Sequence, residues 1–501
     1  MNILIAEPLA PAGIELLQSQ PGWNTIVSNP KEYLQHLAAA DALLVRSAVQ
    51  VDQSVLEKAP KLRVIGRAGV GVDNVDLDAA TAAGVLVMNT PGGNAISVAE
   101  HTLALMLAMA RHIPQANAST RAGKWEKKKF MGSELRGKTL GVVGLGSIGR
   151  EVVRRARAFE MRILAYDPYV TAKIAADAGA ELVSLPKLYA ESDIITLHVA
   201  ATPETQGMLS GAAFRQMKTG VRIVNCARGE LVEEDALREA VQSGKVAGAA
   251  LDVFQVEPLP AGWPLAGLEN VFLTPHIGGS TEEAQEIVGV RIAEQVVEYL
   301  KNGLAINAVN MPALSPDQYR ALSPYATLAG RLGNFAAHIL SGNPRTVRLH
   351  YFGRIADGNT SLLRNAGLAG VLNRSTSGKA NLINAHQIAE QRGWSVGEQH
   401  DQRAGLTDSV RLEVETDKGV TAVEGAVLLG KPRLIQVDGI LCEAALSGFV
   451  IYMRNHDVPG VIGHVGTVLG ANRINIANFS LGRRDSATAP GEPLEAVALV
   501  S

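Results

Sequence analysis

The sequence predicts an α/β protein with two doubly wound parallel sheets, followed by an α+β region. Three observations predict this fold class. Short apolar runs alternate with helical stretches over residues 2–92, a glycine-rich turn joins a strand to a helix at residues 144–149, and a proline-marked linker changes the composition at residues 312–324. A chain of 501 residues is also too long for one hydrophobic core and is expected to form about three domains.

The first domain is predicted from the alternation of strands and helices. Strands are expected at residues 2–6, 42–46, 62–65 and 85–89, with helices such as 12–19 and 54–58 between them. A long Ala/Leu/Met-rich helix over residues 95–118 follows, and an amphipathic helix over residues 282–300 returns to this sheet. The first domain is therefore expected to be discontinuous, comprising residues 1–95 plus 283–310, and a second domain is expected over residues 96–282.

The second domain is organised around a G-x-G-x-x-G pattern formed by Gly144, Gly146 and Gly149. An apolar run at residues 139–143 precedes it, a helical pattern follows it, and Asp167 closes the next strand. This order is typical of a Rossmann dinucleotide site, where the glycines let the backbone turn tightly and approach a pyrophosphate at a helix N-terminus. An acid at Asp167 would accept from a ribose 2′-OH and repel a 2′-phosphate, which favours NAD over NADP. The alternative, a glycine-rich turn in another kind of α/β protein, is disfavoured by the complete order of elements.

Polar residues that follow three later strands form a candidate catalytic set. Further strands are predicted at residues 194–199, 221–226, 247–253 and 271–274. Arg228, Glu257 and His276 lie on the loops after them, and ligands of doubly wound sheets bind outside the carboxyl ends of the strands. A histidine can take a hydroxyl proton, a carboxylate can orient the imidazole, and an arginine can grip a substrate carboxylate. Each residue alone could be a solvated surface group, but together they predict an alcohol–ketone oxidoreductase.

The C-terminal part is predicted to contain a domain over residues 311–445 and a last module over residues 446–501. The domain is expected to have a helix at 325–340, a strand at 346–351, a helical region at 359–392 and a strand meander at 409–437. The last module is expected to have strands at 449–453, 474–481 and 495–500, with a helix that ends at residue 469.

The composition is that of an ordinary soluble protein, with 47% hydrophobic residues, 19% charged residues and a net charge of −2. It gives no sign of a nucleic-acid or membrane surface, and no metal site is predicted. Cys226 and Cys442 are too few for a disulfide framework, which indicates a reducing compartment. The first residues lack the basic start of a signal peptide, and no apolar helical run approaches the roughly 18 residues that a membrane span needs. A cytoplasmic location is therefore expected.

Four further motifs point to a family: LVRS at residues 44–47, RAGVGVDN at 67–74, PGGNA at 91–95 and WEKKKFMG at 125–132. With the glycine pattern and the three strand-end residues, they resemble the D-isomer-specific 2-hydroxyacid dehydrogenases over essentially the whole chain. The resemblance is to long-form members. It implies a flavodoxin-like substrate domain and a Rossmann NAD domain, followed by an α+β intervening domain and an ACT (ferredoxin-like) domain.

The same resemblance implies an activity. Long-form members oxidise 3-phospho-D-glycerate to 3-phosphooxypyruvate with NAD, in the phosphorylated route to L-serine, and are homotetramers. His276 would exchange the hydroxyl proton, Glu257 would be its partner, and Arg228 would orient the substrate.

Binding residues also follow from the resemblance. The cofactor-binding residues would be Gly144, Gly146, Ser147, Ile148, Gly149, Asp167, Val199, Cys226, Ala227, Arg228, Asp252, His276, Gly278 and Gly279. The substrate-binding residues would be Arg46, Ala68, Gly69, Asn94, Lys129, Arg228 and His276. Asp252 would hold the nicotinamide amide. Lys129 belongs to a lysine run that could equally be a solvated face, and Cys226 is expected to line the cofactor pocket rather than react, because hydride transfer needs no thiol.

The last module departs from the ACT pattern. ACT domains run βαββαβ, and this sequence ends in what would be the third strand. Asn455, Asp457 and Asn475 would be the positions that meet an L-serine effector. A sheet without its last strand has an unpaired edge, so serine binding is expected only if further chain or a neighbour covers that edge.

Two alternatives to this function remain open at the level of sequence. One is a related dehydrogenase that acts on glycerate, hydroxypyruvate or 2-hydroxyglutarate; the C-terminal domains and the basic segment near Lys129 disfavour glycerate. The other is a non-catalytic NAD(H)-sensing protein, which the ACT-like module and the lack of a disordered interaction tail disfavour.

Overall fold

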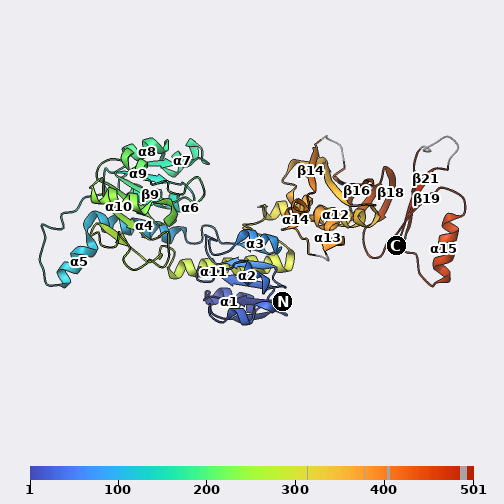
Figure 1. Ribbon diagram of the computed structural model, residues 1–501, viewed down its shortest axis with the longest axis horizontal. Helices are drawn as coiled ribbons and strands as arrows, with labels where there is room; N and C mark the ends of the chain where they lie inside the picture. The colour runs from blue at the N-terminus through green and yellow to red at the C-terminus, as the bar shows by residue number, and fades with distance from the viewer. Residues whose placement is uncertain (313, 377–378, 403–406, 486–492) are drawn as a thin grey trace. The chain divides into compact units, whose positions relative to one another are not determined.

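A computed structural model describes residues 1–312, 314–376, 379–402, 407–485 and 493–501 (Figure 1). The chain forms two compact units. The first unit contains Met1–Pro8, Gly13–Asn89 and Ile292–Ser501, and the second contains Leu9–Ala12 and Thr90–Arg291. Of the described helices, none combines the length and apolarity that a membrane span requires.

The first unit begins with a parallel sheet of strand order β2-β1-β3-β4-β5. Its strands are β1 (Asn2–Ile5), β2 (Asn24–Val27), β3 (Ala42–Val45), β4 (Val64–Arg67) and β5 (Leu86–Met88). Its helices are α1 (Pro11–Gln18), α2 (Gln53–Glu57) and α3 (Leu77–Ala82), with 3₁₀ turns at Tyr33–Gln35 and Leu37–Ala39. Asp52 and Asp76 begin α2 and α3, because each side chain accepts a backbone N–H of the first helical turn. All four predicted strands are present, and the edge strand β2 was missed because its residues are only partly buried.

The helix α11 (Glu282–Asn302) supplies Ile292 and Val296 to this unit. Both pack over Gly66 of β4, where an added Cβ would lie 2.8 Å from Ile292. A glycine in a buried strand therefore lets this helix lie close to the sheet.

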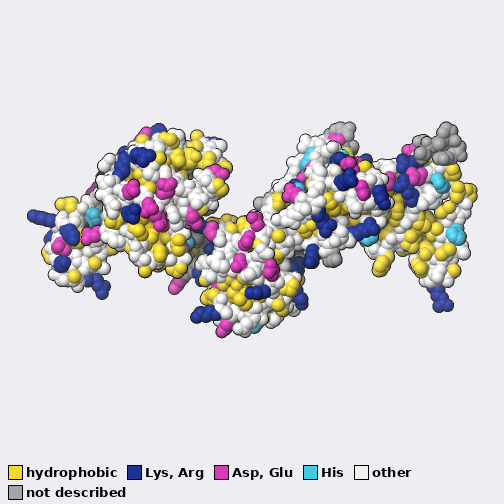
Figure 2. Space-filling model, in the orientation of Figure 1, with side chains coloured by type: hydrophobic (Ala, Val, Ile, Leu, Met, Phe, Trp, Pro, Cys, Tyr) yellow, Lys and Arg dark blue, Asp and Glu magenta, His cyan; other side chains and the backbone are white. Residues whose placement is uncertain are grey.

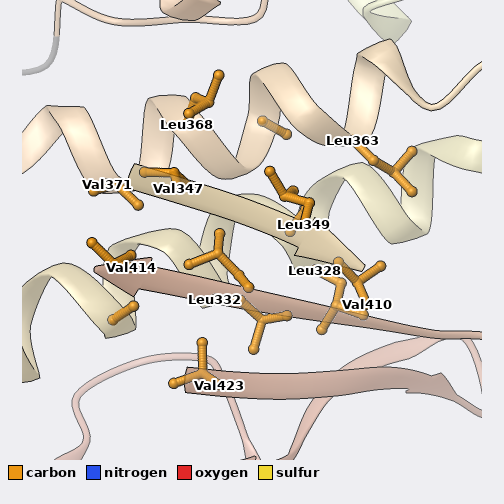
Figure 3. Packing of buried hydrophobic residues seen from close by; sticks show 14 of the residues in the cluster. Leu328, Leu332, Val347, Leu349, Leu363, Leu368, Val371, Val410, Val414 and Val423 are labelled. Carbon is orange, nitrogen blue, oxygen red and sulfur yellow. The ribbon is translucent and has the colours of Figure 1, made fainter. Parts of the chain in front are cut away.

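A mixed sheet of strand order β14-β13-β15-β16-β17-β18 follows in the same unit. Its strands are β13 (Pro344–Phe352), β14 (Ser395–Asp401), β15 (Ser409–Thr416), β16 (Gly419–Leu428), β17 (Lys431–Val437) and β18 (Ile440–Ala445). Its helices are α12 (Pro316–Ile339), α13 (Ser361–Thr376) and α14 (Ala385–Gln391), with a 3₁₀ turn at Gly353–Asp357. Alternate residues of β15 are buried, as expected for a sheet with one covered face. Figure 3 shows Leu328 and Leu332 of α12 and Leu363 and Leu368 of α13 packed with valines and leucines of β13, β15 and β16.

The last module has the order β19 (Ile451–His456), α15 (Val461–Ala471), β20 (Phe479–Arg483) and β21 (Glu495–Val500). Its strands form an antiparallel sheet of order β19-β21-β20. The central strand β21 is almost fully buried, whereas most of α15 is exposed, including Ile462 and Val468. Figure 2 shows hydrophobic side chains at the surface over this module.

The second unit is a doubly wound domain with a parallel sheet of order β12-β11-β10-β9-β6-β7-β8. Its strands are β6 (Thr139–Val143), β7 (Arg162–Tyr166), β8 (Glu181–Leu182), β9 (Ile194–Leu197), β10 (Val221–Asn225), β11 (Val246–Leu251) and β12 (Val271–Leu273). Its helices are α4 (Ala95–Arg111), α5 (Ile113–Arg121), α6 (Ser147–Ala158), α7 (Ala172–Ala178), α8 (Leu185–Glu191), α9 (Gly211–Gln216) and α10 (Glu234–Gln242), with a 3₁₀ turn at Gly229–Leu231. Successive strand residues enter separate cores on the two faces: Val142 packs with α4 and α6, and Val143 with α8, α9 and α10.

The prediction of one long helix over residues 95–118 is wrong in one respect, because the helix is interrupted at His112. This residue is left-handed, with φ 54°, and separates α4 from α5. Pro114 explains the break: it has no N–H to donate, and its ring would clash with the carbonyl four residues earlier. Its fixed φ instead suits the first turn of the new helix.

Candidate active site

The glycine turn between β6 and α6 has the geometry of a phosphate-binding loop. Gly144 has φ 95°, and an added Cβ would lie 2.6 Å from the carbonyl oxygen of His198. An added Cβ on Gly149 would lie 2.0 Å from the carbonyl oxygen of Gly144, so this glycine allows the helix to pack against the turn. Gly146 is different, since no atom lies within 4 Å of its ideal Cβ position. The open space at Gly146, beside the exposed Ser147 at the start of α6, fits the approach of a pyrophosphate.

Asp167 lies directly after β7 and supports the same turn. Its carboxylate accepts the N–H of Leu145 at 2.8 Å and the N–H of Tyr169 at 2.9 Å. A carboxylate has about four acceptor sites, so it can still accept a ribose hydroxyl. The fit to NAD therefore rests on an open glycine and an anchored acid in adjacent loops.

His276 and Glu257 are brought together at the carboxyl edge of the sheet. The Nδ1 atom of His276 lies 2.7 Å from Oε2 of Glu257, and Oε1 of Glu257 accepts the N–H of Phe254 at 3.0 Å. The His276 side chain is 49% exposed, so the ring is open to a ligand while its Nδ1 is held. A carboxylate on Nδ1 fixes the tautomer that leaves Nε2 to exchange a proton with a substrate.

Asp252 anchors the loop that carries His276. This buried carboxylate accepts the hydroxyl of Thr274 at 2.6 Å and the N–H groups of Ile277 and Gly278 at 2.9 and 2.7 Å. His101 of α4 lies beside it, with Nε2 3.4 Å from Oδ1. Burial acts to raise the pKa of Asp252, but the bonds from His101, Thr274 and the two amides outweigh it and lower the pKa. The loop needs an anchor because His276 itself is left-handed, with φ 53°.

Arg228 lies on a loop that a buried amide holds in place. Asn225, at the end of β10, accepts the N–H of Ala227 at 3.0 Å and donates to the carbonyl of Arg228 at 2.8 Å. The guanidinium of Arg228 donates to the carbonyl of Ala227 at 2.7 Å. Asn225 is 1% exposed and was not predicted from the sequence, because a single Asn at a strand end carries no distinguishing pattern.

Other predicted cofactor residues line the same edge. Ile148 and Val199 pack partly buried against the two cores of the domain, and Ala227 is buried. Cys226 is also buried, and burial raises the pKa of its thiol to about 12. A thiol with that pKa is neutral and unreactive at physiological pH. His198 likewise has its pKa lowered by burial, to about 3, and donates or accepts through Nε2 with Thr196 at 3.0 Å.

Asn94 lies against Gly279 in the same unit. An added Cβ on Gly279 would be 2.8 Å from Nδ2 of Asn94, and one on Gly278 would be 3.0 Å from the carboxylate of Asp252. The Oδ1 atom of Asn94 is buried, with no hydrogen-bond partner among the described residues. Such an atom is expected to be satisfied by a ligand or water.

Lys129 lies on the exposed loop before β6. Its N–H donates to Glu126, and its ammonium lies 5.9 Å from the centre of the Phe130 ring. Trp125 and Met131 of this loop are strongly exposed.

Arg46, Ala68 and Gly69 belong to the first unit, where they follow β3 and β4. Arg46 is partly exposed, and its guanidinium lies 3.4 Å from the carbonyl of Pro8. Gly69 has φ 152°, and an added Cβ would collide with the Arg67 side chain. The flexible guanidinium could move aside, so it is the backbone φ, which other residues rarely adopt, that favours glycine in this loop.

The predicted effector residues lie in the last module. Asn455 is on β19, and the N–H of Asp457 donates to the carbonyl of Leu494 at 2.7 Å. Asp457 also accepts from Arg483 at 3.2 Å, and Asn475 is exposed between α15 and β20. Within the described ranges, no group of three or more His, Cys, Asp or Glu side chains is arranged to hold a metal ion.

Comparisons with known proteins place this site in a family. Residues 103–278 match the NAD-binding domain of D-isomer-specific 2-hydroxyacid dehydrogenases, and residues 321–438 match the D-3-phosphoglycerate dehydrogenase intervening domain. The D-3-phosphoglycerate dehydrogenase of Methanocaldococcus jannaschii is 44% identical over 97% of this chain and 93% of its own length. The chain belongs to the D-3-phosphoglycerate dehydrogenase family.

Other members and solved structures agree with this assignment. The D-3-phosphoglycerate dehydrogenase of Bacillus subtilis is 38% identical, over 97% of this chain and 92% of its own length. The structure of Aquifex aeolicus D-lactate dehydrogenase, complexed with NAD and lactic acid, matches with TM-score 0.56 and 30% identity, over 62% of this chain and all of that one. This D-3-phosphoglycerate dehydrogenase family member is thus an NAD-dependent oxidoreductase, and the predicted fold class is confirmed.

Proposed function

We propose that the chain oxidises 3-phospho-D-glycerate at C2 to 3-phosphooxypyruvate, with NAD as hydride acceptor, in the phosphorylated route to L-serine. The observation that carries this proposal is the Glu257–His276 pair, at 2.7 Å, on the same carboxyl edge of the Rossmann sheet as the glycine turn. The choice of 3-phosphoglycerate as the substrate comes from the relatives, which are named D-3-phosphoglycerate dehydrogenases.

In this proposal His276 accepts the C2 hydroxyl proton at Nε2. Glu257 holds Nδ1 and stabilises the imidazolium that forms, because an opposite charge at hydrogen-bond distance favours the charged ring. NAD, when bound, supplies the carbon that accepts the hydride from C2. Arg228 orients the substrate through its carboxylate, for which a guanidinium offers paired donors.

The binding residues are proposed from the membership of the family, and the open glycine turn supports those that would hold the cofactor. Gly144, Gly146 and Gly149, with the start of α6, would hold the pyrophosphate and Asp167 the ribose. Asp252 would meet the nicotinamide amide while it anchors the His276 loop. Arg46, the backbone of Ala68–Gly69, Asn94 and Lys129 are proposed to contact the substrate.

Further parts of the proposal concern organisation. We propose a substrate domain over residues 1–95 plus 283–310, a cofactor domain over 96–282, an intervening domain over 311–445 and an ACT domain over 446–501. A cytoplasmic homotetramer is proposed, in keeping with two cysteines that are both free and buried. L-serine is proposed as an effector at Asn455, Asp457 and Asn475.

The proposed function is tested by NADH absorbance with purified enzyme, NAD and a panel of substrates. 3-Phosphoglycerate is expected to give a higher kcat/KM than D-glycerate or 2-hydroxyglutarate. A clear preference for either of the other two would assign the chain to a different 2-hydroxyacid. If the protein binds NADH but turns over none of these substrates, the proposed reaction is contradicted and a role in NAD(H) sensing is favoured instead.

A further inference from the structure

A buried acid and a buried amide in the first unit hold the loop that presents Arg46. Glu7, just after β1, is 5% exposed, and Asn74, after β4, is 6% exposed. Neither side chain forms part of the cofactor site. Both form hydrogen bonds with the backbone of residues 46–49, the short segment that follows β3.

Glu7 receives the N–H groups of this segment. Its Oε1 accepts from Arg46 at 2.8 Å and from Val49 at 2.9 Å, and its Oε2 accepts from Ala48 at 3.1 Å. Three amides thus converge on one carboxylate, as they do in anion-binding backbone nests. A turn that would otherwise bury unpaired N–H groups is fixed by a single side chain.

Asn74 receives the carbonyl groups of the same segment. Its Nδ2 donates to the carbonyls of Arg46 at 2.9 Å and Val49 at 2.7 Å, which uses both donors of the amide. The two side chains are complementary, since one offers only acceptors to the N–H groups and the other offers donors to the carbonyls. The backbone of Arg46 is gripped on both sides, whereas its side chain stays partly exposed.

If this arrangement contributed only to stability, the burial of a carboxylate would be an unfavourable way to fix the turn. Burial of a carboxylate carries a desolvation penalty, and the hydrogen bonds that the described residues give to Glu7 come from backbone N–H groups of this one segment. Buried polar groups that break the ordinary rules of a core tend to lie at functional sites. The residue that they immobilise here is the one cation of the segment.

We propose that Glu7 and Asn74 are positioning residues, which act through Arg46 to hold its guanidinium ready for an anionic group of the substrate. This inference rests on the proposed function, in which Arg46 contacts the substrate. A displacement of about 1 Å in such a group can cost about 10²-fold in catalytic efficiency. The effect should appear in substrate binding and not in cofactor binding, because neither residue touches the dinucleotide turn.

The test compares the full-length enzyme with Glu7→Gln, Glu7→Asp, Asn74→Asp, Arg46→Ala and the double variant Glu7→Gln/Arg46→Ala. The KM for 3-phosphoglycerate, the KM for NAD, kcat and Tm are measured for each. Glu7→Gln places an NH₂ against one or two backbone N–H groups, and Asn74→Asp places a carboxylate oxygen against two carbonyls, so both variants retain size and replace favourable contacts by repulsive ones.

We expect Glu7→Gln and Asn74→Asp to raise the KM for 3-phosphoglycerate about 10-fold or more, with the KM for NAD unchanged. Glu7→Asp, which keeps two acceptor oxygens, should recover part of the loss and serves if Glu7→Gln does not fold. The double variant should be no worse than Arg46→Ala alone, because a residue that acts through Arg46 has nothing left to position.

Asn310→Ala is the matched control. Asn310 accepts from the N–H of Val87 at 2.9 Å and donates to the carbonyl of Val85 at 2.9 Å, along the edge strand β5 of the same sheet. It should lower Tm without changing the KM for 3-phosphoglycerate.

Three results would overturn the inference: Glu7→Gln lowers only Tm, as the control does; it raises the KM for NAD equally; or its effect multiplies with that of Arg46→Ala. An enzyme that turns over 3-phosphoglycerate with an unchanged KM in Arg46→Ala would also overturn it, while the proposed reaction stands. A wild type that does not oxidise 3-phosphoglycerate would instead defeat the proposed function itself.

Discussion

Single residues in the second unit show how the strained loop that carries His276 is stabilised. His276 has a left-handed backbone conformation. Asp252 stabilises this conformation by accepting hydrogen bonds from the N–H groups of Ile277 and Gly278, the two residues after His276. Because the pKa of Asp252 is lowered, its carboxylate is ionised at any pH above about 4, the ordinary pKa of an aspartate. Its contribution to stability is therefore present above that range and is lost as pH falls through the lowered pKa.

Asp252→Asn should reduce kcat about 10-fold or more, since one oxygen becomes an NH₂ that faces an N–H donor and frees the loop. Steady-state kinetics with 3-phosphoglycerate measure the loss. Asp193→Asn is the control, because Asp193 accepts the N–H of Thr139 at the other edge of the sheet, at 2.8 Å. It should cost about 1 kcal/mol of stability with kcat unchanged. Equal kcat values in both variants would show that Asp252 does not position the loop.

The positions of the site residues were predictable only in part. Arg228, Glu257 and His276 stand out because they follow strands whose carboxyl ends meet at one edge, and Glu257 and His276 do lie together. His101, Glu7 and Asn74 were not predicted, because each acts through contacts between segments far apart in the sequence. Asn225 contacts only residues two and three positions further along, but a single Asn at a strand end carries no distinguishing pattern. No local pattern marks a polar residue that will be buried against a distant loop.

At the scale of elements, the glycine turn gives two substitutions with different outcomes. Gly149→Ala drives a methyl group to within 2.0 Å of the Gly144 carbonyl, so it should destabilise the domain by about 1–3 kcal/mol and weaken NADH binding. Gly146→Ala meets no atom within 4 Å and has an ordinary φ of −70°, so Tm should be unchanged while NADH affinity falls. Thermal unfolding and NADH fluorescence titration distinguish the two. Unaltered NADH affinity in Gly146→Ala would contradict a pyrophosphate at this turn.

The helix pair of the intervening region offers a second matched comparison. An added Cβ on Gly333 of α12 would lie 2.1 Å from the carbonyl of Gly367 in α13, whereas one on Gly330 would make an ordinary contact at 3.5 Å. Gly333→Ala should therefore destabilise by about 1–3 kcal/mol through overpacking. Gly330→Ala should be neutral or stabilise by up to about 1 kcal/mol, because alanine favours the helix. Denaturant unfolding tests this, and equal effects of the two variants would refute the close helix crossing.

Strong local signals predicted most elements, and tertiary pairing decided the others. The run over residues 139–143 predicted β6 because it is apolar and leads into the glycine turn, and the structure confirms a fully buried strand there. β14 has the sequence SVGEQHD, with no apolar alternation, and exists because it pairs in parallel with β13. Pro114 indicates a helix break near His112. The prediction of one continuous helix gave more weight to the Ala-rich composition around this proline.

At the scale of the whole molecule, the last module is tied together by charge across its strands. Glu495 at the start of β21 accepts from Arg454 of β19 and from Arg484 after β20, the latter at 2.7 Å. These two guanidinium groups lower the pKa of Glu495 to about 2. A depressed carboxylate pKa stabilises the fold above its unfolded value of about 4.3, and that contribution disappears as pH falls from there toward 2.

Acid should therefore loosen this module, and Glu495→Gln should remove part of the pH dependence. Hydrogen exchange of the β19 and β21 amides between pH 6 and pH 3 measures the effect, with rates corrected for intrinsic pH dependence. Glu443→Gln serves as the control, because Glu443 is exposed and lies 4.0 Å from Arg433. A pH profile that is identical in wild type and Glu495→Gln would contradict the assigned role of this carboxylate.

The most direct test of the central claim is the initial rate of NADH formation from 3-phosphoglycerate, measured in wild type and in His276→Ala at saturating NAD. If His276 is the base that takes the C2 hydroxyl proton, the variant should lose about 10²-fold or more of kcat while it still binds NADH. A His276→Ala enzyme that retains wild-type turnover would show that another group takes this proton and would contradict the mechanism.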